Sequence, residues 1–109
     1  MDDDAVFKAL ADANRRRLLD RLYARPGQTL MDLCDGLDMS RQGVAKHLAI
    51  LEEANLVSVE RRGREKHHYI NVVPINEIAE RWIATFQRPQ LSMLSALKRT
   101  LEEEDNEPK

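Results

Sequence analysis

Few side chains in this chain are of a type that could carry out chemistry: the 109 residues include three histidines and one cysteine. His67 and His68 are adjacent in a stretch with strand-like alternation, so they point to opposite faces and cannot jointly bind one metal ion. His47 stands at the edge of an apolar helical stripe, where a packed side chain or a phosphate contact is expected. No carboxylate pair and no nucleophile–base spacing stands out. The sequence therefore favours a binding protein over an enzyme.

A second set of candidate groups surrounds Gly63 and consists of cations: Arg61, Arg62, Arg64 and Lys66. Guanidinium and ammonium groups are the side chains that pair with phosphate. β-Branched residues alternate with polar ones over residues 56–62, and alternation returns over 66–72. This pattern predicts two strands joined by a turn at residues 63–65. The cations would then gather at the tip of a β-hairpin, either as an ordinary solvated tip or as a surface that contacts a polyanion.

The helix that must position this hairpin is predicted over about residues 40–54. Ser40 is a good N-cap, and Asn55 suits the left-handed position that follows a helix. An apolar stripe at helical spacing is predicted to be buried: Val44, Leu48 and Leu51. The residues predicted to face outward are Gln42, Lys46, Ala49 and Glu53. The outward face is neutral to basic in its N-terminal half, which suits insertion into a nucleic-acid groove by that end.

A shorter helix is predicted directly before it. Thr29 to Asp32 has the form of a capping box with Asp at its last position. Apolar residues follow at helical spacing (Leu30, Leu33 and Leu37), and Gly36 and Asp38 then break the pattern. A short helix, a tight turn and a longer helix with a polar outer face make a helix-turn-helix. Because the hairpin follows this unit, we interpret it as a wing that contacts DNA.

Further helices are predicted at both ends of the chain. Two of them cover residues 2–11 and the stretch from Asp12 to Ala24. Four arginines on the second could contact phosphate, or could form a solvated face paired with Asp12 and Asp20; they are Arg15, Arg16, Arg17 and Arg21. Pro74 opens a helical stretch over about residues 75–103, with an interruption expected near Pro89.

These terminal helices carry more apolar residues than a small domain can bury. We therefore expect them to pack across a two-fold dimer axis, with plain intrachain core as the alternative. The expected dimerisation residues are Val6, Leu10, Trp82, Phe86, Leu94 and Leu97.

Length and charge set further bounds. A chain of 109 residues with a formal net charge of −2 is expected to form one domain over residues 1–104, with a disordered acidic tail at 105–109. Charge is segregated, because residues 41–69 carry six basic and four acidic side chains and residues 102–109 carry one and five. The single cysteine excludes an intrachain disulfide, and no apolar run approaches the length of a membrane segment. The protein is therefore expected to be cytoplasmic.

Several segments together resemble the ArsR family of bacterial transcriptional repressors. They are DANRR at Asp12–Arg16, SRQGVAKHL at Ser40–Leu48, LEEANLV at Leu51–Val57, Gly63-Arg64 and HYIN at His68–Asn71. The resemblance covers residues 5–103. It implies a mainly α fold with a β-hairpin wing, a winged helix-turn-helix that dimerises through its terminal helices. It also implies binding to double-stranded DNA at a pseudo-palindromic operator, and release by an effector.

The chain departs from the metal-sensing members of that family. Those members carry a Cys-Val-Cys element at the start of the helix that precedes the recognition helix, which here is the helix predicted over about residues 40–54. The matching positions in this chain are Thr29 and Met31. Other members bind zinc through Asp and His residues of the last helix, whereas residues 75–104 contain no histidine. Cys34 stands alone. The chain is therefore similar to the branch without a metal site, and we expect no metal and no cofactor.

The residues expected to contact DNA come from the recognition helix and the wing: Ser40, Arg41, Gln42, Gly43, Lys46, His47, Arg62, Arg64, Lys66 and Tyr69. Among them, Gln42 and Lys46 are expected to read base edges. Gly43 would let the backbone approach DNA closely. Two other functions stay open: a winged-helix module for protein–protein contact, and a redox-responsive regulator that acts through Cys34.

Overall fold

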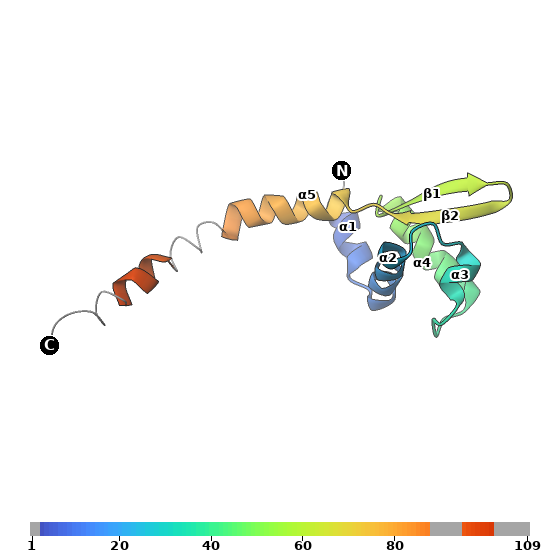
Figure 1. Cartoon of the computed structure of the whole chain (residues 1–109), viewed down its shortest axis with the longest axis horizontal. Coiled ribbons are helices and arrows are strands. Elements are labelled where there is room, and N and C mark those ends of the chain that lie inside the picture. Colours follow the sequence, from blue (N-terminus) through green and yellow to red (C-terminus); the bar gives the residue numbers. More distant parts are fainter. Residues whose placement is uncertain (1–2, 88–94, 102–109) are drawn as a thin grey trace. The chain divides into compact units, whose positions relative to one another are not determined.

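The computed structural model describes residues 3–87 and 95–101 of a chain that divides into two compact units, Met1–Asn76 and Glu77–Lys109 (Figure 1). The first unit contains, in chain order, α1 Asp3–Leu10, α2 Ala13–Ala24, α3 Leu30–Cys34, α4 Arg41–Glu53, β1 Val57–Arg62 and β2 Glu65–Ile70. A further helix, α5 Val73–Trp82, begins in the first unit and ends in the second. The predicted class, mainly α with a β-hairpin, is confirmed.

Three expectations concern residues outside the described ranges. They are the interruption at Pro89, the dimerisation role of Leu94 and the disordered tail at 105–109. One domain over residues 1–104 stays a prediction.

Local chemistry sets both ends of α4. The hydroxyl of Ser40 accepts a hydrogen bond from the amide of Gly43 at 3.0 Å, so Ser40 is the N-cap. Asn55 has a φ of +64°, and the amide of Leu56 donates to the carbonyl of Leu51 at 2.9 Å. This six-to-one bond around a left-handed residue is a Schellman motif, which satisfies carbonyls that the helix end would leave unpaired. Both predicted ends of the helix are therefore confirmed.

Side chains also cap the two preceding helices. Thr29 and Asp32 form the predicted capping box, with the amide of Asp32 donating to Thr29 Oγ1 at 3.2 Å and the amide of Thr29 donating to Asp32 Oδ2 at 3.0 Å. Asp12 is the N-cap of α2, where its carboxylate accepts from the amides of Asn14 and Arg15 at 2.8 and 3.2 Å. These caps fix where α2 and α3 begin.

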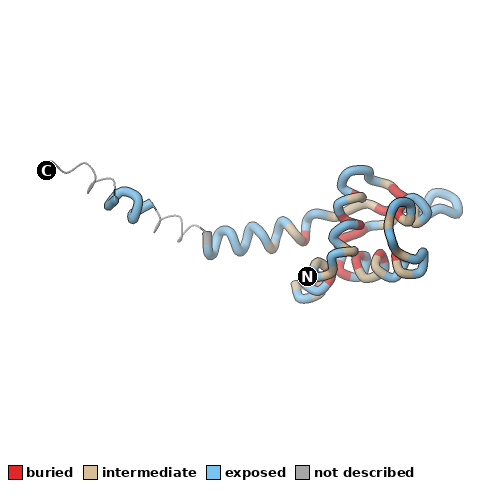
Figure 2. The backbone as a smooth tube through the Cα atoms, turned by 90° about the horizontal axis from the view of Figure 1, so that it is seen from below, coloured by how far each residue is buried: buried red, intermediate tan, exposed pale blue. Residues whose placement is uncertain are grey.

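The core of the first unit lies between α1, α2, α3, α4 and the start of the hairpin. Figure 2 shows the buried residues gathered in this part of the chain. The largest fully buried side chains are Leu18, Leu22, Leu33, Leu51, Leu56, Val6, Val44 and Pro74. Leu48 is also buried, so the predicted inward stripe of α4 is confirmed. The outer face of α4 is left to solvent.

A buried polar contact ties the hairpin to the loop before α3. Gln28 and His68 form an isolated antiparallel bridge, in which the amide of His68 donates to the carbonyl of Gln28 at 2.9 Å. The side chain of Gln28 donates to the carbonyls of Arg21 and Arg25 at 2.8 and 2.7 Å, at the end of α2. Gln28 and His68 are both 4% exposed. The sequence pattern did not predict this link, which orients the hairpin against the helices.

The hairpin has a tighter turn than predicted. Val57 pairs with Ile70 and the register continues to Arg62 opposite Glu65, so only Gly63 and Arg64 form the loop. Gly63 has a φ of +63°, and Arg64 has no positive φ. This is the pattern of a type II′ turn, whose first central position favours glycine. Glu65, expected in the turn, belongs to β2 instead.

The second unit is helical where it is described. α5 ends at Trp82, a π-helical turn covers Ile83–Gln87, and residues 95–101 are helical. Large apolar side chains of this unit are exposed by about half or more: Trp82, Ile83, Phe86, Leu97 and Leu101. The rings of Trp82 and Phe86 meet edge to face, with centroids 5.9 Å apart. None of the helices in the described ranges is long and apolar enough to span a lipid bilayer.

Candidate nucleic-acid interface

The outward face of α4 is as the sequence predicts. Gln42, Lys46, Ala49 and Glu53 are all exposed, and Arg41 is exposed beside them at the first turn. Gln42 and Lys46 are four residues apart, so their side chains lie one above the other on the same face. An amide and an ammonium group in this arrangement can donate several hydrogen bonds to a single ligand edge.

Gly43 and His47 lie toward the side of α4 rather than on its outer face, and both are half-buried. A Cβ at Gly43 would lie 3.2 Å from Oγ of Ser40, which is tighter than an ordinary contact. An alanine at position 43 would therefore require the Ser40 hydroxyl to move by a few tenths of an ångström. His47 contacts α2, because its Nδ1 lies 3.4 Å from Nη1 of Arg15.

The hairpin places its cations on two faces. Arg62 shares one face with Glu60 and Tyr69, and its guanidinium donates to the Tyr69 phenol oxygen at 3.2 Å and lies 3.7 Å from the Glu60 carboxylate. Register puts Arg61 opposite Lys66 on the other face, which also carries the buried His68. Arg64 is exposed at the turn itself. The tip therefore offers cations in several directions rather than one cluster on one face.

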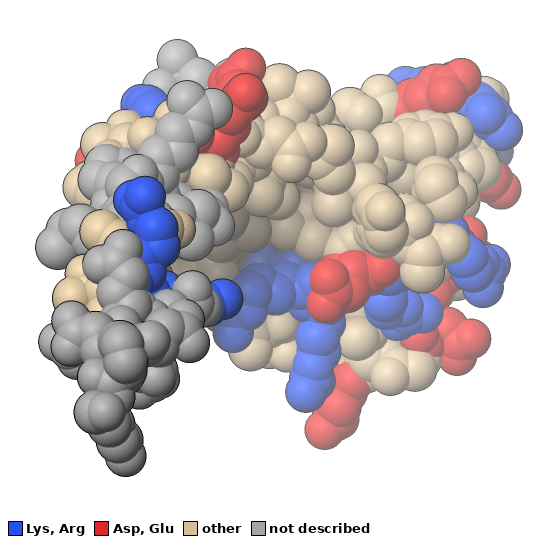
Figure 3. All heavy atoms as spheres, turned by 60° about the vertical axis from the view of Figure 1, so that its left-hand side comes forward, with Lys and Arg blue, Asp and Glu red and all other residues tan. Residues whose placement is uncertain are grey.

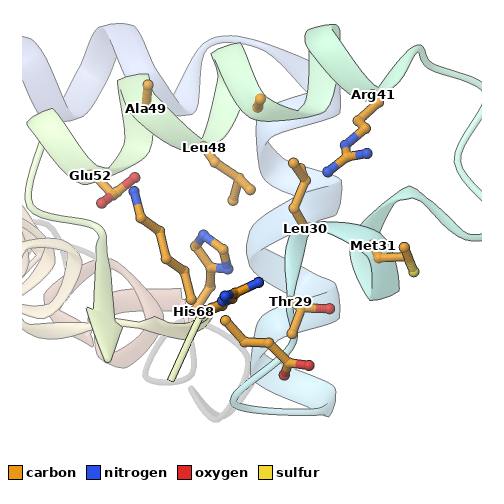
Figure 4. Close-up of a pocket in the computed structure, with 12 residues that line it drawn as sticks. Thr29, Leu30, Met31, Arg41, Leu48, Ala49, Glu52 and His68 are labelled. Carbon is orange, nitrogen blue, oxygen red and sulfur yellow. The ribbon is translucent and has the colours of Figure 1, made fainter. Parts of the chain in front are cut away.

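A groove separates α4 from the hairpin (Figure 4). It has a volume of about 530 Å³ and is open to solvent. Leu48 and Ala49 of α4 line it, together with Leu30 of α3 and His68 of β2. Three residues predicted to contact DNA also line it: Arg41, Arg64 and Lys66. The groove thus brings the first turn of α4 and the hairpin tip to one site.

Three of the four arginines of α2 donate hydrogen bonds to backbone carbonyls of neighbouring helices, whereas Arg17 is exposed. Arg15 donates to the carbonyls of Ala9 and Lys8, both at 2.8 Å, and Arg16 donates to the carbonyl of Leu10 at 2.7 Å. Arg21 reaches the end of α3 and donates to the Leu33 carbonyl at 2.9 Å. These side chains satisfy carbonyls at helix C-termini, where cations are favoured. Pairing with Asp12 is limited to a 3.9 Å contact from Arg15.

Two carboxylates are held in their charged form by helix caps. The amide N–H groups of Arg15 and Asn14 lower the pKa of Asp12 below its ordinary value of 3.8, and the cation of Arg15 adds to this effect. The amide and hydroxyl of Thr29 lower the pKa of Asp32 in the same way. Hydrogen bonds to the ionised form stabilise it, which is the physical cause in both cases.

The two adjacent histidines point to opposite faces, as predicted. Nδ1 of His67 lies 2.7 Å from the carbonyl of Gly27 and its Nε2 lies 3.1 Å from the Glu65 carboxylate. Nδ1 of His68 lies 2.9 Å from the carbonyl of Gln28. In the described part of the chain, no three His, Cys, Asp or Glu side chains are grouped as a metal site would require. Cys34 is a half-buried free thiol.

Charge on the surface is mixed. On the face shown in Figure 3, basic and acidic side chains are interspersed at several places and a broad uncharged area lies between them. This agrees with the formal net charge of −2. Recognition of a polyanion must therefore depend on local cations rather than on the overall field.

Comparison with known proteins gives consistent matches. The family model for a helix-turn-helix domain, HTH_20, matches residues 10–60. The uncharacterized HTH-type transcriptional regulator YuzN of Bacillus subtilis is 40% identical, over 73% of this chain and 94% of its own length. The transcriptional repressor SdpR of the same organism is 30% identical, over 74% of this chain and 88% of its own.

Comparison with solved structures also finds transcriptional regulators. An ArsR-like transcriptional regulator from Rhodococcus sp. RHA1 is 32% identical and superposes with a TM-score of 0.70, over 90% of this chain and 91% of that one. These relatives are transcriptional regulators and not enzymes. The chain therefore belongs to the ArsR family and is a DNA-binding transcriptional regulator with a winged helix-turn-helix fold.

Proposed function

We propose that this regulator is a dimeric repressor that binds a pseudo-palindromic operator. The observation that carries the proposal is the exposed pair Gln42 and Lys46 on the N-terminal half of α4, next to a hairpin with four exposed cations. A recognition helix reads the major groove with its N-terminal residues. Repression is supported by the similarity to SdpR, which is described as a transcriptional repressor.

Within each half-site, we assign two kinds of contact. Gln42 and Lys46 read base edges, because an amide and an ammonium group are suited to the donor and acceptor pattern of the major groove. The other expected residues contact or support contact with the sugar–phosphate backbone: Ser40, Arg41, Gly43, His47, Arg62, Arg64, Lys66 and Tyr69. Tyr69 acts through Arg62, because its phenol oxygen accepts from that guanidinium. Backbone contacts fix register and orientation, whereas the base contacts supply specificity.

The proposed dimer uses the exposed apolar residues of the second unit. Trp82, Phe86 and Leu97 are 51%, 56% and 58% exposed, which is unusual for side chains of this size on a monomer. In the first unit, Leu10 of α1 is partly exposed, and we propose that it also takes part in the dimer. Val6 is fully buried within the protomer. It therefore packs α1 against the core and adds no area to a dimer interface.

Selection of genomic fragments by the full-length protein, followed by footprinting, tests the proposal. The expected footprint has two symmetric protected half-sites about one helical turn apart. The chief alternative is a winged-helix module for protein–protein contact, and the cations at the hairpin tip argue against it because such a module has no need of them. Recovery of fragments with no shared sequence, bound no better than random duplex, would favour that alternative.

A further inference from the structure

The groove between α4 and the hairpin contains a polar group that the DNA-binding account does not use. His68 is 4% exposed and lines the groove, and Figure 4 shows its imidazole between β2 and Leu48. Nδ1 lies 2.9 Å from the carbonyl of Gln28. A carbonyl only accepts, so Nδ1 carries the proton and Nε2 of the neutral ring presents a lone pair.

Nε2 of His68 has no protein partner within the described ranges. Every described side-chain nitrogen or oxygen that is sealed from solvent does have a hydrogen-bond partner. Nε2 is therefore in contact with the solvent of the groove, although the residue as a whole is buried. A fixed acceptor of this kind, held in one tautomer by a backbone carbonyl, is suited to a ligand that donates a hydrogen bond.

The size and lining of the groove restrict the class of ligand that it can bind. Its volume of about 530 Å³ lies within the roughly 300–1,000 Å³ that is usual for small-molecule sites. Part of the lining of the groove is apolar, from Leu30, Ala45 and Leu48. A flat or compact apolar body would cover these side chains.

Charge at the rim favours an anion. Arg41, Arg64 and Lys66 line the groove, against the carboxylates of Glu52 and Glu65. The Glu65 carboxylate also contacts His67, on the opposite face of the hairpin, at 3.1 Å. The rim of the groove therefore carries three exposed cations and two exposed carboxylates, an excess of one positive charge.

We propose that this groove binds a small hydroxylated aromatic carboxylate. The hydroxyl donates to Nε2 of His68, the ring covers the apolar lining, and the carboxylate pairs with the cations of the rim. Because Arg41, Arg64 and Lys66 are also proposed to contact DNA phosphates, the ligand and DNA exclude one another. The mutual exclusion of ligand and DNA rests on the proposed function, whereas binding of the ligand to the free protein does not.

The first experiment is titration of the free full-length protein with 4-hydroxybenzoate, followed by calorimetry and by amide chemical shifts. Phenol, which lacks the carboxylate, and benzoate, which lacks the hydroxyl, are the matched probes. The expected result is saturable binding of 4-hydroxybenzoate at or below about 1 mM, at least fivefold tighter than either control. Absence of saturable binding, or equal binding of all three probes, overturns the proposal.

Two variants locate the site. Ala45→Leu extends an exposed side chain of α4 into the groove and is expected to lower the affinity for 4-hydroxybenzoate at least tenfold, whereas Ala24→Leu, the same change at an exposed position of α2, leaves it unchanged. His68→Phe is expected to make 4-hydroxybenzoate bind no better than benzoate. Because His68 is buried, Ala45→Leu decides the question if His68→Phe fails to fold. Unchanged binding in Ala45→Leu places the ligand elsewhere and contradicts the proposal.

The final step adds DNA. In wild-type protein, 4-hydroxybenzoate is expected to raise the apparent dissociation constant for a selected duplex linearly with its concentration L, by the factor 1 + L/KL, where KL is the dissociation constant measured for 4-hydroxybenzoate on the free protein. Simultaneous binding of ligand and DNA overturns the exclusion. If the free protein binds the ligand but no selected duplex exists, the proposed function fails while the site stands. If Ala45→Leu weakens DNA binding and no probe binds the free protein, the groove serves DNA alone and the ligand proposal is wrong.

Discussion

Nη1 of Arg15 lies 3.4 Å from Nδ1 of His47, so a side chain of α2 reaches the recognition helix. A guanidinium only donates, which makes Nδ1 the acceptor and leaves the ring proton of neutral His47 on Nε2. The same guanidinium group donates to the carbonyls of Lys8 and Ala9 at the end of α1. Arg15 thus joins α1, α2 and α4 and fixes how α4 is presented.

Replacing Arg15 should therefore cost stability. Arg15→Gln removes the charged donor from two carbonyls of α1, and we expect the free energy of unfolding to fall by about 1–3 kcal/mol. Urea denaturation followed by circular dichroism measures it. Arg17→Gln is the matched control, because Arg17 is exposed on the same helix and such a change is usually worth less than about 0.5 kcal/mol. Equal stability of the two variants would contradict the joining role of Arg15.

The N-cap of α2 predicts how stability responds to acid. The folded-state pKa of Asp12 is lowered below 3.8 by the amides of Arg15 and Asn14. A carboxyl whose pKa is lower in the folded chain stabilises it above the unfolded pKa, and this stabilisation is lost as pH falls through the folded pKa. Unfolding free energy should therefore decline as pH drops toward and below 3.8.

Two substitutions separate the cap from its charge. Asp12→Asn keeps an acceptor that is a good N-cap, so it should retain most stability at pH 7 but show a shallower decline in acid. Asp12→Ala loses the acceptor and should be less stable at both pH values. Denaturation curves at pH 7 and pH 3.5 give the comparison. An acid dependence that is the same in Asp12→Asn and wild type would rule out Asp12 as a source of it.

Much of this arrangement follows from local sequence signals. Ser40 and Asn55 fix the ends of α4, and the alternation around Gly63 predicts the hairpin, because caps and turns depend on a few neighbouring residues. The contacts between residues far apart in the chain could not be predicted from such local signals. Gln28 bonds to His68 forty positions away, and Arg15 reaches His47, and neither pair has a periodic signature. The groove lies between α3, α4 and the hairpin and was not predicted as a whole, although Arg41, Arg64 and Lys66 were each expected to contact DNA.

The wing should contribute affinity that does not depend on sequence. Neutralising Arg64 in Arg64→Gln removes an exposed cation at the turn, and the slope of log affinity against log salt concentration should become shallower by about 0.9 for one lost phosphate contact. Fluorescence anisotropy at several salt concentrations measures this slope. Arg99→Gln, an exposed change in the second unit, serves as the control. An unchanged slope in Arg64→Gln would remove Arg64 from the interface.

The proposed dimer should be sensitive to charge at the exposed aromatic residues. Phe86→Asp places a carboxylate where the partner's apolar surface would cover it, and an unpaired buried charge is strongly unfavourable. Sedimentation at micromolar concentration should show a dimer for wild type and a monomer for this variant. Asn76→Asp adds the same charge at an exposed position of α5 and should stay dimeric. A monomeric wild type would contradict the dimer directly.

The central claim is that α4 reads DNA sequence through Gln42 and Lys46. The decisive measurement compares the affinities of wild type, Gln42→Ala and Lys46→Ala for a selected operator and for a scrambled duplex at one salt concentration. We predict that each substitution weakens operator binding by about 1–3 kcal/mol and changes binding to the scrambled duplex much less, so the ratio of the two affinities falls. If wild type binds both duplexes equally, or if both variants keep the wild-type ratio, readout of sequence by this helix is wrong.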